Sequence, residues 1–176
     1  FYCHWPQMIN SDLRKHIKID GKDTVELDYS CLHLSMLYGL EGMIPPDGDL
    51  YHIDGISTIF RKIIKKAVNI SINAEDERAA AQALRQEYQS FIDEVGYIPD
   101  KPSTIISAIG YNHLPIQKYL CSGHGVHLQY LDSSIAEEIM LNLAEKDICC
   151  LCIHDSFIID IEHRDLLNNL IIYYIL

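Results

Sequence analysis

The stretch from Asp147 to Ile161 limits the possible folds more than any other part of the chain. Two apolar runs rich in β-branched residues flank a short polar interruption, His154-Asp155-Ser156. This pattern predicts a buried strand, a tight turn and a second strand. A carboxylate at such a turn is costly to bury unless it meets a cation or several donors. Asp155 is therefore a candidate functional residue, and a hydrogen-bonded hairpin turn is the alternative interpretation.

A second aspartate, Asp28, stands where a predicted strand gives way to a predicted helix. Asp20-Gly21 lies between two alternating runs, which is a hairpin signal, and the second run ends at Asp28. Apolar residues then recur at helical spacing from Leu32 onward. A side chain at the end of a strand is available to a ligand, so Asp28 is the second candidate. Its alternative role is that of a helix cap.

Residues 56–73 predict an amphipathic helix with a basic face. The polar arc consists of Arg61, Lys62, Lys65, Lys66, Asn69 and Asn73. The apolar arc consists of Ile56, Ile59, Phe60, Ile63, Ile64, Ala67 and Val68. Such a polar face is usually a solvated helix surface. In this acidic chain, however, it is one of the few clusters of cations that could bind an anionic ligand.

Further helices are predicted between this basic helix and the C-terminal hairpin. One covers residues 74–95 and ends at Gly96. Shorter helical segments reach residue 120, and a last helix begins at a cap provided by Asp132, Ser133 or Ser134. The expected organisation is therefore a sheet with several helices packed around it.

The chain also contains a possible zinc set, formed by Cys121, His124 and His127. Zinc sites favour these residue types, and neighbouring thiols at 149, 150 and 152 could add ligands. Two ligand pairs at the spacing of a zinc finger are absent, however. Adjacent cysteines in an apolar strand are more often small core residues. The sequence therefore favours a packing role for the thiols.

Length and charge narrow the classes of function. At 176 residues the chain fits one domain with a sizeable core. Its net charge of −11 argues against a nucleic-acid-binding protein that acts alone, because such proteins usually carry a basic footprint. The chain opens on an aromatic run at Phe1 and closes on an apolar run at Leu176. We therefore expect a fragment whose missing segments, or a partner protein, supply further parts.

No apolar run approaches the roughly 20 residues that a membrane-spanning helix needs. No signal peptide is visible, and the cysteine pattern is not that of a disulfide framework. We therefore expect no membrane partner and a reducing, cytoplasmic location.

Three segments together resemble motifs of family A DNA polymerases and of T7-type single-subunit RNA polymerases. Val25-Glu-Leu-Asp-Tyr-Ser30 is similar to the first metal-binding motif of family A. Arg61-x-x-x-Lys65 and the residues after it resemble the fingers helix that meets the incoming nucleotide. Val126 to Ser134, ahead of Ile153-His-Asp-Ser-Phe157, is similar to the closing segment of the T7 type.

The resemblance implies an α+β fold with a palm-like antiparallel sheet packed on helices and a partial fingers region of helices. Residues 1–55 would form the first part of the palm, 56–120 the fingers-like region, and 121–176 the second part of the palm. The implied enzyme is a template-directed nucleotidyltransferase, a DNA-directed DNA or RNA polymerase. Its expected partners are a nucleic acid template and primer and nucleoside triphosphates.

The resemblance also assigns roles to single residues. Asp28 and Asp155 would bind two Mg²⁺ ions, as two-metal phosphoryl transfer requires, with the backbone carbonyl of Tyr29 as a further metal ligand. His154 would position the strand or its 3′ end. The triphosphate would be bound by Arg61 together with Lys65 or Lys66, since the motif can be aligned through either lysine.

Two departures from the family pattern leave the sugar open. In family A a Glu five positions after the first Asp rejects the ribose 2′-hydroxyl, and this chain has His33 there. The fingers motif usually ends in Tyr-Gly, and Asn73-Ala74 stands here. His33 and Asn73 thus complete the expected nucleotide-binding set, and a neutral imidazole at His33 would accept a hydrogen bond from a ribonucleotide. The alternative function is a degenerate palm, kept as a structural or binding module in a mobile element or larger assembly.

Overall fold

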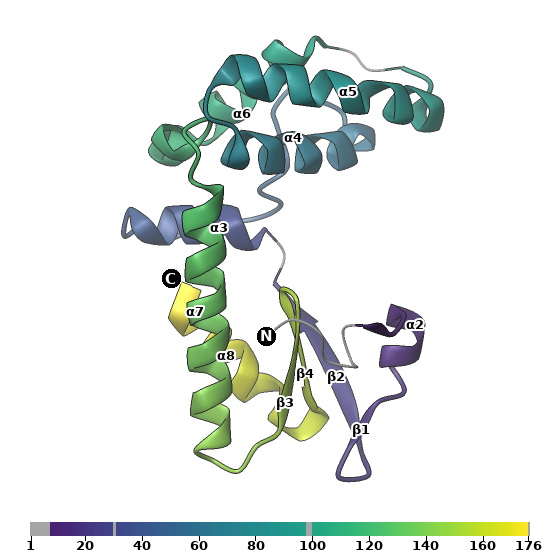
Figure 1. The fold of residues 1–176 in the computed structure, drawn as a ribbon, viewed down its shortest axis with the longest axis vertical. Helices are drawn as coiled ribbons and strands as arrows, with labels where there is room; N and C mark the ends of the chain where they lie inside the picture. Colours follow the sequence, from purple (N-terminus) through teal and green to yellow (C-terminus); the bar gives the residue numbers. More distant parts are fainter. Residues whose placement is uncertain (1–7, 30, 98–99, 176) are drawn as a thin grey trace. The chain divides into compact units, whose positions relative to one another are not determined.

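Four strands from the two ends of the chain form one antiparallel sheet. A computed structural model of the protein describes residues 8–29, 31–97 and 100–175. The strands β1 (Lys18–Ile19), β2 (Lys22–Asp28), β3 (Cys150–Ile153) and β4 (Ser156–Asp160) are arranged in the order β1-β2-β4-β3 (Figure 1). The expected mixture of helices with an antiparallel sheet is therefore confirmed.

Both hairpins that the sequence predicts are present. Asp20-Gly21 joins β1 to β2, and its φ angles of 51° and 80° are both positive, as a type I′ turn requires. His154-Asp155 joins β3 to β4, and His154 adopts the left-handed region with φ 53°. Histidine is among the residues that enter this region more readily than most.

The two faces of the sheet differ in polarity. Pairing places Val25 opposite Ile159 and Leu27 opposite Phe157, so these four apolar side chains share one face. The opposite face of β2 carries Glu26 and Asp28. On β4, Ile158 lies on this second face and is 1% exposed, so burial is not confined to the apolar face.

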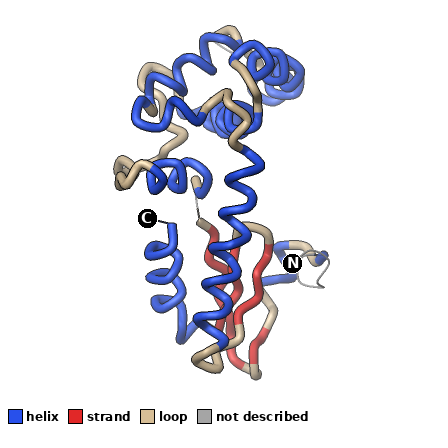
Figure 2. The backbone as a smooth tube through the Cα atoms, turned by 60° about the vertical axis from the view of Figure 1, so that its left-hand side comes forward, coloured by secondary structure: helices blue, strands red, loops and turns tan. Residues whose placement is uncertain are grey.

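Helices of the same region cover the sheet. The helix α8 (Arg164–Ile175) follows the short 3₁₀ helix η3 (Ile161–His163) and contacts both β2 and β4. It buries Leu167, Ile171 and Ile175. Figure 2 shows α8 and the lower part of α7 running alongside the strands. Every residue of the inner strand β4 is buried.

The helix α7 (Gly125–Ala144) begins earlier than the sequence predicts. The cap expected at residues 132–134 is wrong, because these residues lie inside the helix. The Ser133 and Ser134 hydroxyls donate to the backbone carbonyl of Tyr130 at 2.8 and 3.0 Å. A serine that bonds back to the preceding turn does not have to end or start a helix.

The central part of the chain is helical. It contains α3 (Leu32–Leu40), the 3₁₀ helix η1 (Thr58–Phe60), α4 (Arg61–Asn73), α5 (Glu77–Val95), α6 (Pro102–Asn112) and the 3₁₀ helix η2 (Leu114–Tyr119). The Asp76 side chain caps α5 by accepting from the backbone N–H of Ala79, and Gly96 ends it with φ 89°. No helix within the described ranges is long and apolar enough to cross a bilayer.

The predicted basic helix has the expected buried and exposed sides. Ile63, Ile64, Ala67 and Val68 are buried, and the cations of α4 are exposed. The prediction is wrong for Ile59, which is 58% exposed. The reason is that residues 58–60 form a 3₁₀ turn, so the 3.6-residue period does not extend back to them.

Two compact units make up the chain. The sheet unit comprises residues 1–32 and 130–176, and the helical unit comprises residues 33–129. The predicted palm and fingers boundaries after residues 55 and 120 are a different partition, and the correspondence of the units to palm and fingers stays a prediction.

Candidate functional site

The strand register brings Asp28 and Asp155 to the same end of the sheet. Asp28 is the last residue of β2, and it pairs with Ser156, the first residue of β4. Asp155 immediately precedes Ser156 in the hairpin turn. Both aspartates are exposed. Two carboxylates that are 127 positions apart in the sequence, by subtraction of 28 from 155, are therefore neighbours along one strand pair.

Local hydrogen bonds hold the turn that carries Asp155. The Cys152 thiol donates to the backbone carbonyl of His154 at 3.6 Å. The Ser156 hydroxyl lies 3.0 Å from the Ile153 carbonyl, across the base of the turn. The side chain of His154 is exposed beside Asp155. The turn thus presents an imidazole and a carboxylate to solvent from a braced backbone.

A network on the polar face of the sheet, which sequence reasoning missed, braces the same end. Arg14, at the end of the short helix α2 (Ser11–Arg14), donates through Nε and Nη2 to the Glu26 carboxylate at 3.1 and 2.8 Å. The Ser156 hydroxyl lies 2.7 Å from Glu26 Oε1. Its single proton is shared between this oxygen and the Ile153 carbonyl, and the charged carboxylate is the nearer acceptor.

This network stabilises the ionised form of Glu26. The hydrogen bonds from Arg14 are the main cause that lowers the pKa of Glu26, and the Ser156 hydroxyl adds to them, while partial burial opposes both. Glu26 and Asp28 are two positions apart on one strand and so share a face. That spacing was the only sequence signal that could have linked Glu26 to the aspartate site.

A third carboxylate, Asp132 on α7, lies in the neighbourhood of the turn. Burial is the main cause that raises the pKa of the Cys152 thiol, and the charges of Asp132 and then Asp155 raise it further. Both carboxylates therefore act on one thiol of β3. The backbone carbonyl of Tyr29, the other expected metal ligand, follows directly after β2.

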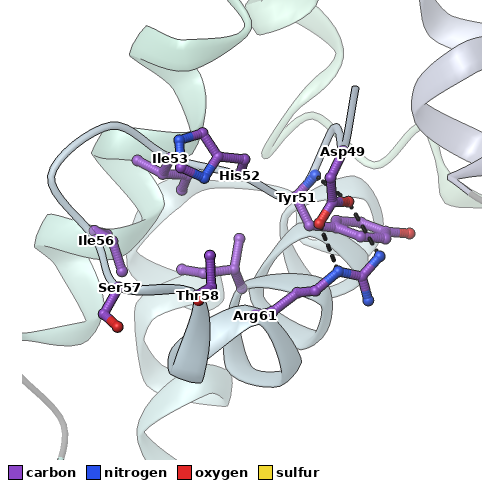
Figure 3. A pocket seen from close by; sticks show the side chains of 9 residues that line it. Asp49, Tyr51, His52, Ile53, Ile56, Ser57, Thr58 and Arg61 are labelled. Carbon is purple, nitrogen blue, oxygen red and sulfur yellow. Dashed lines mark hydrogen bonds and ion pairs between the residues drawn. The ribbon is translucent and has the colours of Figure 1, made fainter. Parts of the chain in front are cut away.

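The candidate triphosphate ligand Arg61 lies in the helical unit and is bound by a carboxylate of its own chain. Its Nε and Nη2 atoms contact the two oxygens of Asp49 at 2.5 and 3.0 Å (Figure 3). The guanidinium carbon lies 5.2 Å from the centre of the Tyr51 ring. The hydrogen bonds from Arg61 are the main cause that lowers the pKa of Asp49. Figure 3 shows these side chains on the wall of a small hollow that also includes Thr58.

The two outer lysines of α4 are paired with α5. Lys62 contacts Glu94 at 2.5 Å and Lys66 contacts Glu87 at 3.3 Å. Lys65 has no carboxylate within 4 Å among the described residues, and its Nζ atom lies 5.9 Å from the Tyr51 ring centre. Exposed pairs of this kind contribute at most about 1 kcal/mol. They can therefore be exchanged for a stronger anionic ligand.

Asn73 and His33, the remaining candidate nucleotide ligands, also belong to the helical unit. The Asn73 amide donates to the Asn69 carbonyl at 2.8 Å. A Cβ atom added to Gly125 would lie 2.0 Å from Asn73 Oδ1, so this side chain packs where only a glycine fits. His33 is half-buried in the first turn of α3. Asn73 thus has a packing role in addition to its proposed role.

The possible zinc residues do not form a metal cluster. No group of three or more potential ligands gathers anywhere in the described part of the chain. The Ser122 hydroxyl lies 2.8 Å from Nδ1 of His124, and burial is the main cause that raises the pKa of the Cys121 thiol. A raised pKa disfavours the thiolate, which is the form that binds zinc.

A buried polar cluster, which sequence reasoning also missed, fixes the loop whose Asp49 binds Arg61. His113 is 2% exposed, with Nε2 2.9 Å from the Leu50 carbonyl and Nδ1 3.0 Å from the Tyr38 hydroxyl. The carbonyl can only accept, so Nε2 carries the proton and Nδ1 accepts from Tyr38. Burial lowers the pKa of His113. Because Leu50 is next to Asp49, the cluster positions the partner of Arg61.

The chain matches no family model, no curated protein and no solved structure. The likeness to polymerase motifs therefore rests on the residues quoted from the sequence. The candidate functional groups are the aspartate pair of the sheet unit and the cations of the helical unit.

Proposed function

We propose that this chain is a palm-like nucleotidyl-transfer module that joins nucleoside triphosphates to a 3′ end. The single observation that supports the proposal is the register of β2 and β4, in which Asp28 pairs with the residue after Asp155. Phosphoryl transfer by two metal ions needs carboxylates from separate strands at one place. The proposed kinship is with family A DNA polymerases, or with T7-type RNA polymerases as the alternative.

The donor set suits magnesium held jointly by protein and substrate. Mg²⁺ prefers oxygen ligands and is usually bound by one or two carboxylates together with substrate phosphates. Asp28 and Asp155 supply two exposed carboxylates, and the Tyr29 carbonyl is a further oxygen. A closed all-protein cage is not formed, since no cluster of three ligating side chains occurs in the described ranges. The proposed Mg²⁺ sites are therefore completed by the nucleotide.

In this proposal the residues of the sheet unit have distinct tasks. Bound Mg²⁺ would neutralise charge on the phosphoryl oxygens and favour ionisation of the attacking 3′ hydroxyl. Asp28 and Asp155 hold negative charge at one end of the sheet. Glu26 and Ser156 keep β2 and β4 in register beside them. His154, exposed in the same turn, donates a hydrogen bond to the nucleic acid strand or its 3′ end.

The cations of α4 would bind the triphosphate. Asp49 already occupies the fork of Arg61 in the two-point geometry that a phosphate group would take. Lys65 or Lys66 would add a second positive charge. Phosphate oxygens carry more charge than a single carboxylate, so a triphosphate can displace Asp49 and Glu87 from these weak exposed pairs.

Primer extension tests the proposal. We expect Asp28→Asn and Asp155→Asn each to lower the rate of Mg²⁺-dependent extension by a factor of about 100 or more, because removing a transition-state charge interaction costs several kcal/mol. Asp23→Asn, on the same strand and in an exposed pair with Lys18, is the matched control and should leave the rate unchanged. Extension that survives both of the first two changes would refute the assignment.

A degenerate palm that binds without catalysing is the second candidate function. The observation in its favour is that Arg61 and Lys66 are both paired with carboxylates of their own chain. Measuring the Mg²⁺-dependent binding of a nucleoside triphosphate to this chain separates the candidates. Binding with no extension supports the binding module. Extension that requires Asp28 and Asp155 supports the enzyme.

A further inference from the structure

The helix α5 has two polar sides with opposite properties. Glu87 and Glu94 reach the lysines of α4, as described above. On another side Arg78, Gln82 and Arg85 are exposed at positions i, i+4 and i+7, which share one face of a helix. Glu87 and Glu94 are thus paired with α4, whereas Glu77 remains beside Arg78 on the second side.

This second side of α5 lines a broad hollow next to α6. The hollow has a volume of about 890 Å³, and α5 and α6 lie in contact (Figure 1). Its lining consists of Glu77, Arg78, Ala81, Gln82, Arg85, Gln86 and Ser103. Two guanidinium groups, two amides and a hydroxyl therefore face one carboxylate. Such a wall offers mainly hydrogen-bond donors, which suits an anion.

A second hollow continues the surface over α6. It measures about 390 Å³ and shares Ser103 with the first. The other residues that line it are Thr104, Ser107, Ala108 and Tyr111. Tyr111 is 72% exposed, so its ring is accessible to a ligand. Together the two hollows make one surface, with cations at the α5 end and an aromatic ring at the α6 end.

The two arginines differ from the cations of α4 in having no acidic partner. Within the described ranges, no carboxylate lies within 4 Å of Arg78 or Arg85, whereas Arg61, Lys62 and Lys66 each have one. The net charge of −11 repels a polyanion at long range, so the attraction to a negatively charged partner has to come from these two guanidinium groups at short range. The fork geometry of arginine matches phosphate in particular.

The spacing of these groups decides the class of ligand. Arg78 and Arg85 are seven residues apart, which is about 10 Å along a helix. This separation allows the two guanidinium groups to contact different phosphates of one nucleic acid strand. A ring such as that of Tyr111 stacks with a base only if the base is unpaired, and stacking of this kind tolerates any sequence. A single strand therefore fits better than a duplex or an acidic peptide.

We propose that the strand-binding face, formed by Arg78, Gln82 and Arg85 of α5 with Ser103 and Tyr111 of α6, binds single-stranded nucleic acid. The arginines contact phosphates, and Tyr111 stacks on a base. Glu77 at one end of the face disfavours a phosphate beyond Arg78, so the strand runs from Arg78 over Gln82 and Arg85 toward Ser103. This binding needs no metal ion and does not depend on the proposed catalysis at Asp28 and Asp155.

The test is the fluorescence anisotropy of a labelled 15-nucleotide oligo(dT), titrated with the full chain in EDTA at low salt. Replacing both arginines, Arg78→Gln with Arg85→Gln, should weaken binding about tenfold or more and reduce the slope of log K against log salt by roughly 1.4, or 0.7 for each phosphate. Tyr111→Ala should weaken binding on the order of tenfold. The matched control removes two exposed charges from the sheet unit, Lys15→Gln with Arg164→Gln, and should have little effect.

Several results would overturn the proposal. One is the absence of oligo(dT) binding by a wild-type chain whose thermal unfolding is cooperative. A second is an equal loss of oligo(dT) affinity in the arginine variant and in the control variant. A third is an equal affinity for duplex DNA together with no effect of Tyr111→Ala. A fourth is displacement of the labelled oligo(dT) by poly-glutamate as effectively as by unlabelled oligo(dT). The variant with Asp28→Asn and Asp155→Asn should bind oligo(dT) normally in EDTA. Failure of the catalytic proposal is therefore distinguishable from failure of this one.

Discussion

The sheet unit and the helical unit differ in the exposure and the pairing of the charged residues in their motifs. In the sheet unit, Glu26 is neutralised by Arg14 while Asp28 and Asp155 remain exposed at the end of the sheet. In the helical unit, two of the motif cations are paired with carboxylates, Arg61 with Asp49 and Lys66 with Glu87. The difference shows that a motif specifies which residue types stand at a position, whereas the fold decides how exposed each side chain is.

The largest expected effect comes from removing the buried histidine behind Asp49. His113→Phe leaves the Tyr38 hydroxyl and the Leu50 carbonyl without their buried partner. We expect the free energy of unfolding to fall by about 3 kcal/mol, since each unsatisfied buried group costs roughly 1–3 kcal/mol. Urea unfolding measures this. His16→Phe, at an exposed position, is the control, and an equally small loss in both would contradict the buried cluster.

The same histidine makes stability depend on pH. Burial lowers the pKa of His113 in the folded state below its ordinary value of 6.5. Below pH 6.5 the unfolded chain therefore takes up a proton that the folded chain does not, so stability falls as the pH falls. His113→Phe should flatten this part of the pH profile between pH 7 and 5, in the same urea measurements.

An intermediate effect is expected from the network of the sheet unit. Glu26→Ala removes the carboxylate that joins Arg14 to Ser156, and we expect a loss of about 1–2 kcal/mol, typical of a partly buried charged hydrogen bond. The folded pKa of Glu26 is lowered, so this contribution is present above its unfolded pKa of 4.5 and disappears as the pH falls through the folded pKa. Glu138→Ala, exposed on α7, is the control. A loss that persists unchanged at pH 2 would show that packing, and not charge, is responsible.

The smallest effect on stability is expected for a substitution of Asp49. This substitution tests whether the paired cations of the helical unit can still bind a ligand. Asp49→Asn weakens an exposed pair and should change the free energy of unfolding by less than about 1 kcal/mol. It also removes the carboxylate charge that competes with phosphate for Arg61, so under the proposed function the affinity for a nucleoside triphosphate should rise severalfold. Equilibrium dialysis in Mg²⁺ measures the affinity, with Glu94→Gln as the control. A weaker affinity in Asp49→Asn would mean that Arg61 needs Asp49 for its position.

The regular elements could be predicted because their signals are local. Alternating residues and the Asp20-Gly21 turn specify β1 and β2, and the polar interruption at His154-Asp155 specifies the second hairpin. The aspartate site depends on the pairing of β2 with β4. The sequence alone could not show that these two strands are neighbours. It is decided by which apolar faces pack together and not by either segment alone.

The occupied state of the cations could not be predicted for the same reason. Asp49, Glu87 and Glu94 are ordinary exposed acids in the sequence, and nothing in the spacing assigns them to Arg61, Lys66 and Lys62. The role of His113 was missed as well, because its partners are the Tyr38 hydroxyl and a backbone carbonyl. Every residue has a backbone carbonyl, so the sequence does not show which carbonyl accepts from His113. The helix start predicted at Ser133 or Ser134 was wrong for a related reason. A serine hydroxyl can form hydrogen bonds both at a helix cap and inside a helix.

The pairing of β2 with β4 also sets the order in which the protein can fold during its synthesis. Glu26 and Ser156, which meet in the sheet, are 130 positions apart, and the whole helical unit lies between them in the sequence. At about 5–20 residues per second, a ribosome needs on the order of ten seconds to make that interval. The helical unit is complete before β4 is synthesised. It can therefore fold while Val25 and Leu27 of β2 are not yet paired with β4. The nascent chain therefore carries a strand without its β4 partner throughout the synthesis of this interval, and a chaperone that covers Val25 and Leu27 would protect it at this stage.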